Sequence, residues 1–110
     1  AGAKKVLFAS AAPPVKYQNL YGIDMAATKE LIAHNKTESE IAETIGADEL
    51  IYQTLEDLIS SVQEGNPEIK EFETSIFTGV YPTDIDDGYL QDLEESRSDI
   101  IKMSEQKKAK

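Results

Sequence analysis

Two short apolar runs near the amino end decide the fold: Lys5-Val6-Leu7-Phe8-Ala9-Ser10-Ala11-Ala12-Pro13-Pro14, and then Asn19-Leu20-Tyr21-Gly22-Ile23-Asp24-Met25. Each run stops at small, rigid or charged residues. Buried parallel strands have this continuous apolar character, and the loops at their carboxyl ends carry the groups that bind ligands. The prolines cannot continue a central strand, because neither has an N–H to donate. We therefore expect buried strands over 6–10 and 19–24.

The residues that follow alternate between helix and strand patterns. Three threonines stand where helices are expected to start, and two of them are followed three residues later by an acidic residue, as in a capping box. Alternating strands and helices are typical of an α/β fold with a mainly parallel sheet. The expected elements are a short helix over 29–34 after Thr28, a helix between Thr37 and Gly46, a strand over 49–53, and an amphipathic helix from Thr54 to Gly65.

Beyond Pro67 the pattern loosens. Apolar residues without a firm period surround a turn at Thr78-Gly79, and they predict an irregular segment packed over the core. A final helix is expected over 88–106, with Glu94 and Arg97 among its solvated residues and Leu90 and Leu93 on its apolar face. The chain is thus expected to divide into an α/β part over 1–66 and an irregular segment with a C-terminal helix over 67–110.

Composition excludes several classes of partner. The chain has 110 residues, 21 acids against 11 bases and a net charge of −10, whereas nucleic-acid binding needs clustered cations. The one basic cluster, Lys107 to Lys110, is at the end of the chain and is expected to be solvated. No run approaches the roughly 20 apolar residues of a membrane span. With no targeting segment in the sequence, the expected compartment is the cytoplasm.

Most familiar catalytic patterns are missing. The sequence has no Gly-rich phosphate loop, no cysteine and one histidine, His34, for which a cap or surface role is expected. No ligand spacing for zinc exists. The acidic run over 84–88 differs from a calcium loop and precedes a helix, so we expect it to complement that helix N-terminus.

Among the carboxylates, Asp24 has the position best suited to a binding or catalytic role. It ends an apolar run, the place where open α/β sheets present ligand-binding groups. A carboxylate there fits Mg²⁺, held directly or through water, or a ribose hydroxyl. It equally fits an N-cap of the following helix, and the residues alone leave the two readings open.

Collinear strings along almost the whole chain, about 1–93, resemble the amidophosphoribosyltransferases. They are Gly2-Ala3-Lys4-Lys5-Val6, Ala9-Ser10-Ala11-Ala12-Pro13-Pro14, Tyr21-Gly22-Ile23-Asp24-Met25, Glu30-Leu31-Ile32-Ala33-His34, Ile45-Gly46-Ala47-Asp48 with Ile51-Tyr52-Gln53, Leu55-Glu56-Asp57-Leu58-Ile59, and Phe77-Thr78-Gly79. The resemblance implies part of a phosphoribosyltransferase domain. The parent enzyme makes 5-phosphoribosylamine from phosphoribosyl pyrophosphate (PRPP) and glutamine at the start of de novo purine synthesis.

The resemblance also implies cofactors and partners. Mg²⁺ is held with the pyrophosphate, and purine nucleotides inhibit the parent enzyme. Some members carry an iron–sulfur cluster on cysteines, partly in the region matching 73–76. Because this chain has no cysteine, no such cluster is expected. The remainder of the enzyme chain is the expected partner, and a homo-oligomer is expected through exposed sheet edges.

By looser analogy with related phosphoribosyltransferases, Asp24 is the candidate for indirect metal contact, and Ser10 and Tyr21 are candidate wall residues of the substrate crevice. The PRPP loop and the glutaminase domain of the family lie outside these residues, so the isolated chain is expected to be inactive. The abrupt start directly before an apolar strand favours a piece of a larger domain. The alternative is a stand-alone acidic α/β interaction module without catalysis.

Overall fold

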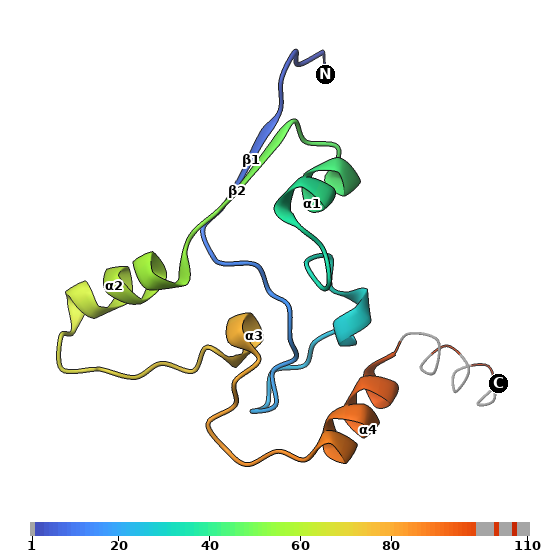
Figure 1. Ribbon diagram of the computed structural model, residues 1–110, viewed down its shortest axis with the longest axis vertical. Helices are drawn as coiled ribbons and strands as arrows, with labels where there is room; N and C mark the ends of the chain where they lie inside the picture. Colours follow the sequence, from blue (N-terminus) through green and yellow to red (C-terminus); the bar gives the residue numbers. More distant parts are fainter. Residues whose placement is uncertain (1, 99–102, 104–106, 108–110) are drawn as a thin grey trace.

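The structure is a computed structural model, and it describes residues 2–98, 103 and 107. Figure 1 shows a strand pair at one end, with the helices arranged around and beyond its carboxyl edge. The elements in chain order are β1 (Leu7–Ser10), the 3₁₀ helix η1 (Thr28–Glu30), α1 (Glu38–Ile45), β2 (Glu49–Tyr52), α2 (Leu55–Gly65), α3 (Ser75–Thr78) and α4 (Asp87–Arg97).

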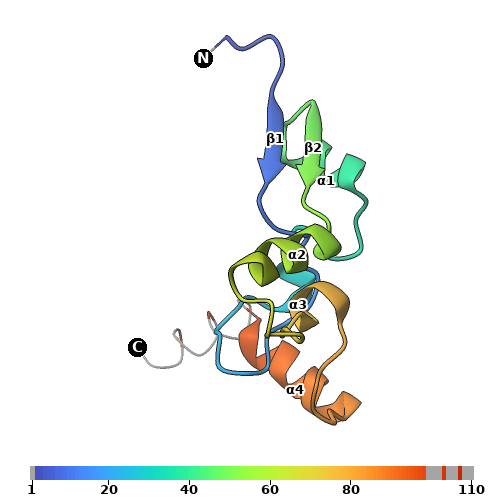
Figure 2. The ribbon, with the colours of Figure 1, turned by 90° about the vertical axis from the view of Figure 1, so that its left-hand side faces the viewer.

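The two strands form a parallel pair, which Figure 2 shows side by side. Leu7 pairs with Glu49 and Ser10 pairs with Tyr52. Parallel neighbours require a crossover, and the 11–48 connection provides it with η1 and α1. Asp48 joins the segments that lead into the two strands, because the backbone N–H of Val6 donates to Asp48 Oδ2 over 2.6 Å. The expected α/β fold with a parallel sheet is confirmed.

Local capping chemistry sets the helix ends. Thr37 caps α1 in a reciprocal capping box with Glu40, whose Oε2 accepts from the Thr37 N–H over 2.7 Å. Gly46 ends α1 with a φ of 73°, a left-handed conformation that glycine adopts without penalty. Thr54 caps α2 and Asp86 caps α4 through their side-chain oxygens. The predicted role of the 84–88 acidic run at a helix N-terminus is confirmed at Asp86.

Two sequence predictions for secondary structure are wrong. Residues 19–24 form no strand, because Asn19 Oδ1 accepts from the N–H groups of Tyr21 and Ile23 over 2.9 and 3.1 Å. These local bonds replace a strand ladder. The expected helix over 29–34 shrinks to η1, since the backbone at Leu31 is extended with ψ of 128°. Of the final helix, residues 99–102 and 104–106 lie outside the described residues.

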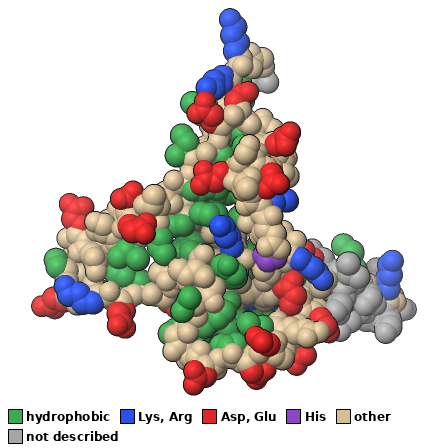
Figure 3. Space-filling view, viewed as in Figure 1, with side chains coloured by type: hydrophobic (Ala, Val, Ile, Leu, Met, Phe, Trp, Pro, Cys, Tyr) green, Lys and Arg blue, Asp and Glu red, His purple; other side chains and the backbone are tan. Residues whose placement is uncertain are grey.

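The first strand is not buried in this chain. Leu7 and Phe8 are 57% and 52% exposed, because β1 has one neighbouring strand among the described residues, where a buried parallel strand has two. The radius of gyration is 17.4 Å, against about 13 Å for a compact domain of this length. Figure 3 shows apolar side chains open to view over α2 and the centre of the molecule. The apolar residues buried among those described are Pro13, Ala27, Ala33, Ile41 and Ala42.

The 74–79 turn joins the C-terminal half to the segment that follows β1. The backbone N–H groups of Lys16 and Tyr17 both donate to the Ile76 carbonyl, over 2.9 and 3.1 Å. Gly79 has a φ of 73° and lies against the Tyr17 ring, where a Cβ would come within 2.9 Å of ring atoms. The short helix α3 was not expected from the sequence. The expected turn at Thr78-Gly79 is present, with Gly79 at the end of α3.

Candidate functional site

A buried polar pair, Gln18 and Asn19, connects three parts of the chain. Each residue is 4% exposed. The pair begins the loop over residues 20–27, which lies beside α3 and α4 (Figures 1 and 2). Buried polar groups destabilise a protein unless they are hydrogen-bonded, so the partners of this pair define what holds the loop.

Arg97, the last residue of α4, binds the start of this loop. Its Nη1 donates to Gln18 Oε1 over 3.1 Å and to the Asn19 carbonyl over 2.9 Å, and its Nη2 donates to the Ile23 carbonyl over 3.4 Å. The guanidinium is a rigid planar fork with several donors, so one side chain can hold separate backbone oxygens at once.

Glu94, one turn earlier on α4, binds the end of the same loop. Its carboxylate accepts from the backbone N–H of Thr28 over 2.6 Å, from that of Lys29 over 3.1 Å, and from Gln18 Nε2. Burial acts to raise the pKa of Glu94, but the hydrogen bonds from Lys29, Thr28 and Gln18 outweigh it and lower the pKa. Glu94 is therefore held as a carboxylate at neutral pH.

Tyrosine hydroxyls complete the surroundings of the pair. Tyr81 donates to the Gln18 carbonyl over 2.9 Å. Burial, with Glu73 and neighbouring tyrosines, raises the pKa of Tyr81, so its phenol stays protonated and donates. The Tyr21 hydroxyl bonds the Thr83 hydroxyl over 2.9 Å, which joins the loop to the segment before α4.

The three site residues expected from sequence occupy different settings. Ser10 ends β1, and its hydroxyl is used by its own turn, donating to the Ala12 carbonyl over 3.0 Å. Tyr21 and Asp24 lie on the loop that Gln18, Asn19, Glu94 and Arg97 hold. No hydrogen bond described in the structure joins Ser10 to either of them.

Asp24 is exposed and makes no hydrogen bond or ion pair to the residues that the structure describes. The N-cap position of η1 is Ala27, so Asp24 does not cap that helix. Within the described part of the chain, no three His, Cys, Asp or Glu side chains are placed to hold a metal ion. Mg²⁺ is often held by only one or two carboxylates plus substrate phosphates, so Asp24 fits as one contributor and not as a complete site.

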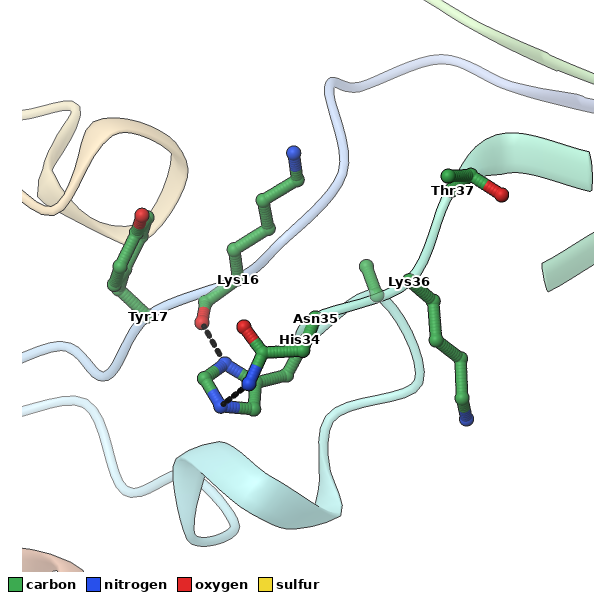
Figure 4. A pocket seen from close by; sticks show the side chains of 7 residues that line it. Lys16, Tyr17, His34, Asn35, Lys36 and Thr37 are labelled. Carbon is green, nitrogen blue, oxygen red and sulfur yellow. Dashed lines mark hydrogen bonds between the residues drawn. The ribbon is translucent and has the colours of Figure 1, made fainter. Parts of the chain in front are cut away.

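His34 lines a cavity of about 280 Å³, shown in Figure 4, and it also lines a second cavity of about 420 Å³ together with Gln18 and Glu94. Its Nδ1 lies 3.3 Å from the Lys16 carbonyl and its Nε2 lies 3.1 Å from Asn35 Nδ2. A carbonyl accepts and an amide nitrogen donates, so these partners assign the neutral tautomer with hydrogen on Nδ1. The ammonium groups of Lys16 and Lys36 point in different directions and do not converge. Both ring nitrogens of His34 are thus engaged by neighbouring groups of the chain.

Sequence reasoning missed the four residues that hold the loop. Glu94 and Arg97 were placed among the solvated residues of the final helix, and both are half-buried. One signal could have found them. Leu90, Leu93, Glu94 and Arg97 stand at i, i+3, i+4 and i+7, the spacing of a single helix face. The two charged residues therefore share the face that carries the leucines.

The fold and this polar network define the class: an α/β segment in which a parallel strand pair precedes a loop held by a C-terminal helix. No family model matches the chain. It is similar to amidophosphoribosyltransferases at 53% identity over 110 residues in Pasteurella multocida, 51% over 108 in Saccharomyces cerevisiae and 54% over 103 in Escherichia coli. These matches cover 99%, 98% and 93% of this chain and 22%, 21% and 20% of those proteins.

The chain belongs to the amidophosphoribosyltransferases, and it spans about a fifth of the length of the curated relatives that it matches. The α/β architecture with a parallel strand pair is consistent with part of a phosphoribosyltransferase-type fold.

Proposed function

We propose that this chain is a segment of a glutamine-dependent transferase that forms 5-phosphoribosylamine from PRPP in the first step of de novo purine synthesis. The observation that carries the proposal is about 50% identity to amidophosphoribosyltransferases over nearly the whole chain. The isolated chain is inactive in this proposal, because phosphoribosyl transfer depends on groups that cradle both phosphates of the substrate. Such groups are not assembled among its described residues.

The remainder of the enzyme chain is the proposed partner. The side chains of Leu7, Phe8 and Ile51 are all more than half exposed on the strand pair. Leu7 and Ile51 lie on one face of the pair and Phe8 on the other, so both faces leave apolar side chains uncovered, and further strands with covering helices would bury them. The open shape, with a radius of gyration of 17.4 Å, supports this reading over that of a stand-alone module. Residues 1–66 would supply the α/β part and 67–110 the segment that packs on it.

Within the enzyme, we assign the loop over 20–27 to the wall of the substrate crevice. Asp24 is exposed and unengaged among the described residues, so its carboxylate is free to contact a water on Mg²⁺ or a ribose hydroxyl. When bound, the ion would neutralise charge on the departing pyrophosphate. Tyr21 and Ser10 are proposed as further wall residues. The absence of cysteine supports the assignment to the branch without an iron–sulfur cluster.

Regulation and setting follow the same proposal. Purine nucleotides would inhibit the enzyme, and a homo-oligomer in the cytoplasm is its proposed form. No helix in the described part of the chain is long and apolar enough to cross a membrane. The charge of −10 supports a partner other than nucleic acid.

The test is kinetic and uses the full-length enzyme that carries this segment. Glutamine-dependent consumption of PRPP is measured with Mg²⁺ for the wild type, for Asp24→Asn and for Asp92→Asn, which changes an exposed aspartate of α4. We expect Asp24→Asn to raise the KM for PRPP about tenfold and Asp92→Asn to leave it within about twofold of the wild type. An unchanged KM in Asp24→Asn rejects the role of this carboxylate, and a wild-type enzyme that does not consume PRPP rejects the proposed activity.

A further inference from the structure

We infer that Glu94 and Arg97 are positioning residues for the substrate crevice, acting through Gln18 and Asn19 to hold the loop that carries Tyr21 and Asp24. This inference rests on the proposed function, since it concerns how the same loop is presented to PRPP. It assigns a role to α4 beyond that of a packing helix.

The loop depends on α4 for its position. No backbone–backbone hydrogen bond in the described part of the chain involves residues 20–26. Inside the loop, the N–H groups of Tyr21 and Ile23 donate to the Asn19 side chain. The loop is therefore shaped by Asn19 from within, and its place in the molecule is set by side-chain bonds: those of Arg97 and Glu94, and the one between the Tyr21 and Thr83 hydroxyls.

A single helical turn of α4 holds both ends. Arg97 donates to the Asn19 carbonyl just before the loop and to the Ile23 carbonyl within it, and Glu94 accepts from the N–H groups of Thr28 and Lys29 just after it. The cationic guanidinium of Arg97 therefore meets backbone carbonyl oxygens, and the carboxylate of Glu94 meets backbone N–H groups. Charge-assisted hydrogen bonds are roughly twice as strong as neutral ones, which favours this arrangement over solvent contact.

Gln18 couples the two charged side chains. Its Oε1 accepts from Arg97 and its Nε2 donates to Glu94, so the two charges fix the orientation of the carboxamide. Because Gln18 is 4% exposed, either bond lost on one side would leave a buried polar atom without its partner. The two ends of the loop are thus held as one unit and are expected to loosen together.

The perturbation that tests this is Arg97→Lys in the full-length enzyme. Lysine keeps the charge and helix propensity, but its single nitrogen cannot reproduce a fork that binds Gln18, Asn19 and Ile23 together. Glu94→Gln is the second variant, and it tests the other end of the loop. Glu95→Gln is the matched control, since it makes the same chemical change at the next, exposed position of α4.

The expected result has a structural and a kinetic part. Hydrogen exchange of the 20–28 amides should speed up in Arg97→Lys and in Glu94→Gln, and not in Glu95→Gln. The KM for PRPP should rise about tenfold with kcat changed by less than about twofold, the pattern of lost binding without lost chemistry. The effects of Arg97→Lys and Asp24→Asn on the KM should be less than additive in the double variant, because Arg97 positions the loop on which Asp24 lies.

Three outcomes would overturn the inference. If the loop loosens in Arg97→Lys and the KM is unchanged, while Asp24→Asn raises it, the positioning role fails and the proposed function stands. If Arg97→Lys and Asp24→Asn have independent, additive effects, α4 acts by a route other than this loop. If neither variant changes the KM for PRPP, the positioning role and the proposed role of Asp24 fail together.

Discussion

Replacing Gly79 with alanine tests how the turn after α3 is fitted to the segment after β1. Gly79 ends α3 with a φ of 73°, and a Cβ built on it would lie 2.9 Å from two atoms of the Tyr17 ring. This separation is well below the optimal 3.5–4.0 Å of a carbon–carbon contact, so the ring or the turn has to move. The movement would disturb the neighbouring bonds from Lys16 and Tyr17 to the Ile76 carbonyl.

Two physical effects add up in this substitution. A residue with a Cβ in the left-handed region loses roughly 1–2 kcal/mol. The Tyr17 ring is 37% exposed and can move aside, so its displacement adds up to about 1 kcal/mol, the low end of the cost of overpacking. We therefore expect Gly79→Ala to lower the free energy of unfolding by about 1–3 kcal/mol. Gly46→Ala separates the two effects, because Gly46 ends α1 at the same φ of 73° with no atom within 4 Å of the added Cβ.

The assay is urea unfolding followed by circular dichroism. Gly46→Ala should lower the free energy of unfolding by the backbone part alone, roughly 1–2 kcal/mol. Gly79→Ala should lower the free energy of unfolding more than Gly46→Ala does in the wild-type background. In a Tyr17→Ala background this difference should disappear, because the ring that the added Cβ would meet is gone. Equal losses for the two glycine variants in the wild-type background would refute the argued contact between Gly79 and Tyr17.

The remaining predictions concern capping and pH. Thr37→Ala removes the N-cap of α1 and should lower the free energy of unfolding by about 1 kcal/mol, measured by urea unfolding. Thr44→Ala, inside the same helix, is the control, and an equal loss there would count against the capping argument. The pKa of Glu94 is lowered below its ordinary 4.5, so its stabilisation is complete above pH 4.5 and is lost as pH falls through the folded value. The free energy of unfolding of the wild type should therefore exceed that of Glu94→Gln at neutral pH, and this difference should shrink in acid. A difference that stays constant from neutral pH to pH 3 would contradict the prediction.

The helix termini were predictable because their causes are local. Thr37 with Glu40, Gly46 and Thr54 each act within one helical turn, and the structure places helix ends at these residues. The strand predicted over 19–24 is wrong for a reason that is also local. The apolar run over 19–24 has the composition of a strand, and Asn19 turns it into a loop by taking its N–H groups.

The candidate site was only partly accessible from sequence. Asp24 and Tyr21 were selected by their place at the end of an apolar run, and their role is a proposal. Glu94 and Arg97 were assigned to solvent, because a charged residue on a helix is usually solvated. Their half-buried setting arises from groups more than sixty residues earlier in the chain, at Gln18 and Thr28.

The sequence by itself determined the α/β alternation, the caps and the family, because these rest on short-range chemistry and on collinear matches. Tertiary structure alone decided that the loop over 20–27 is held from α4, because this depends on the distant donors and acceptors that Glu94 and Arg97 meet. Pairing across a long separation leaves no period in the sequence, so only the folded arrangement reveals it.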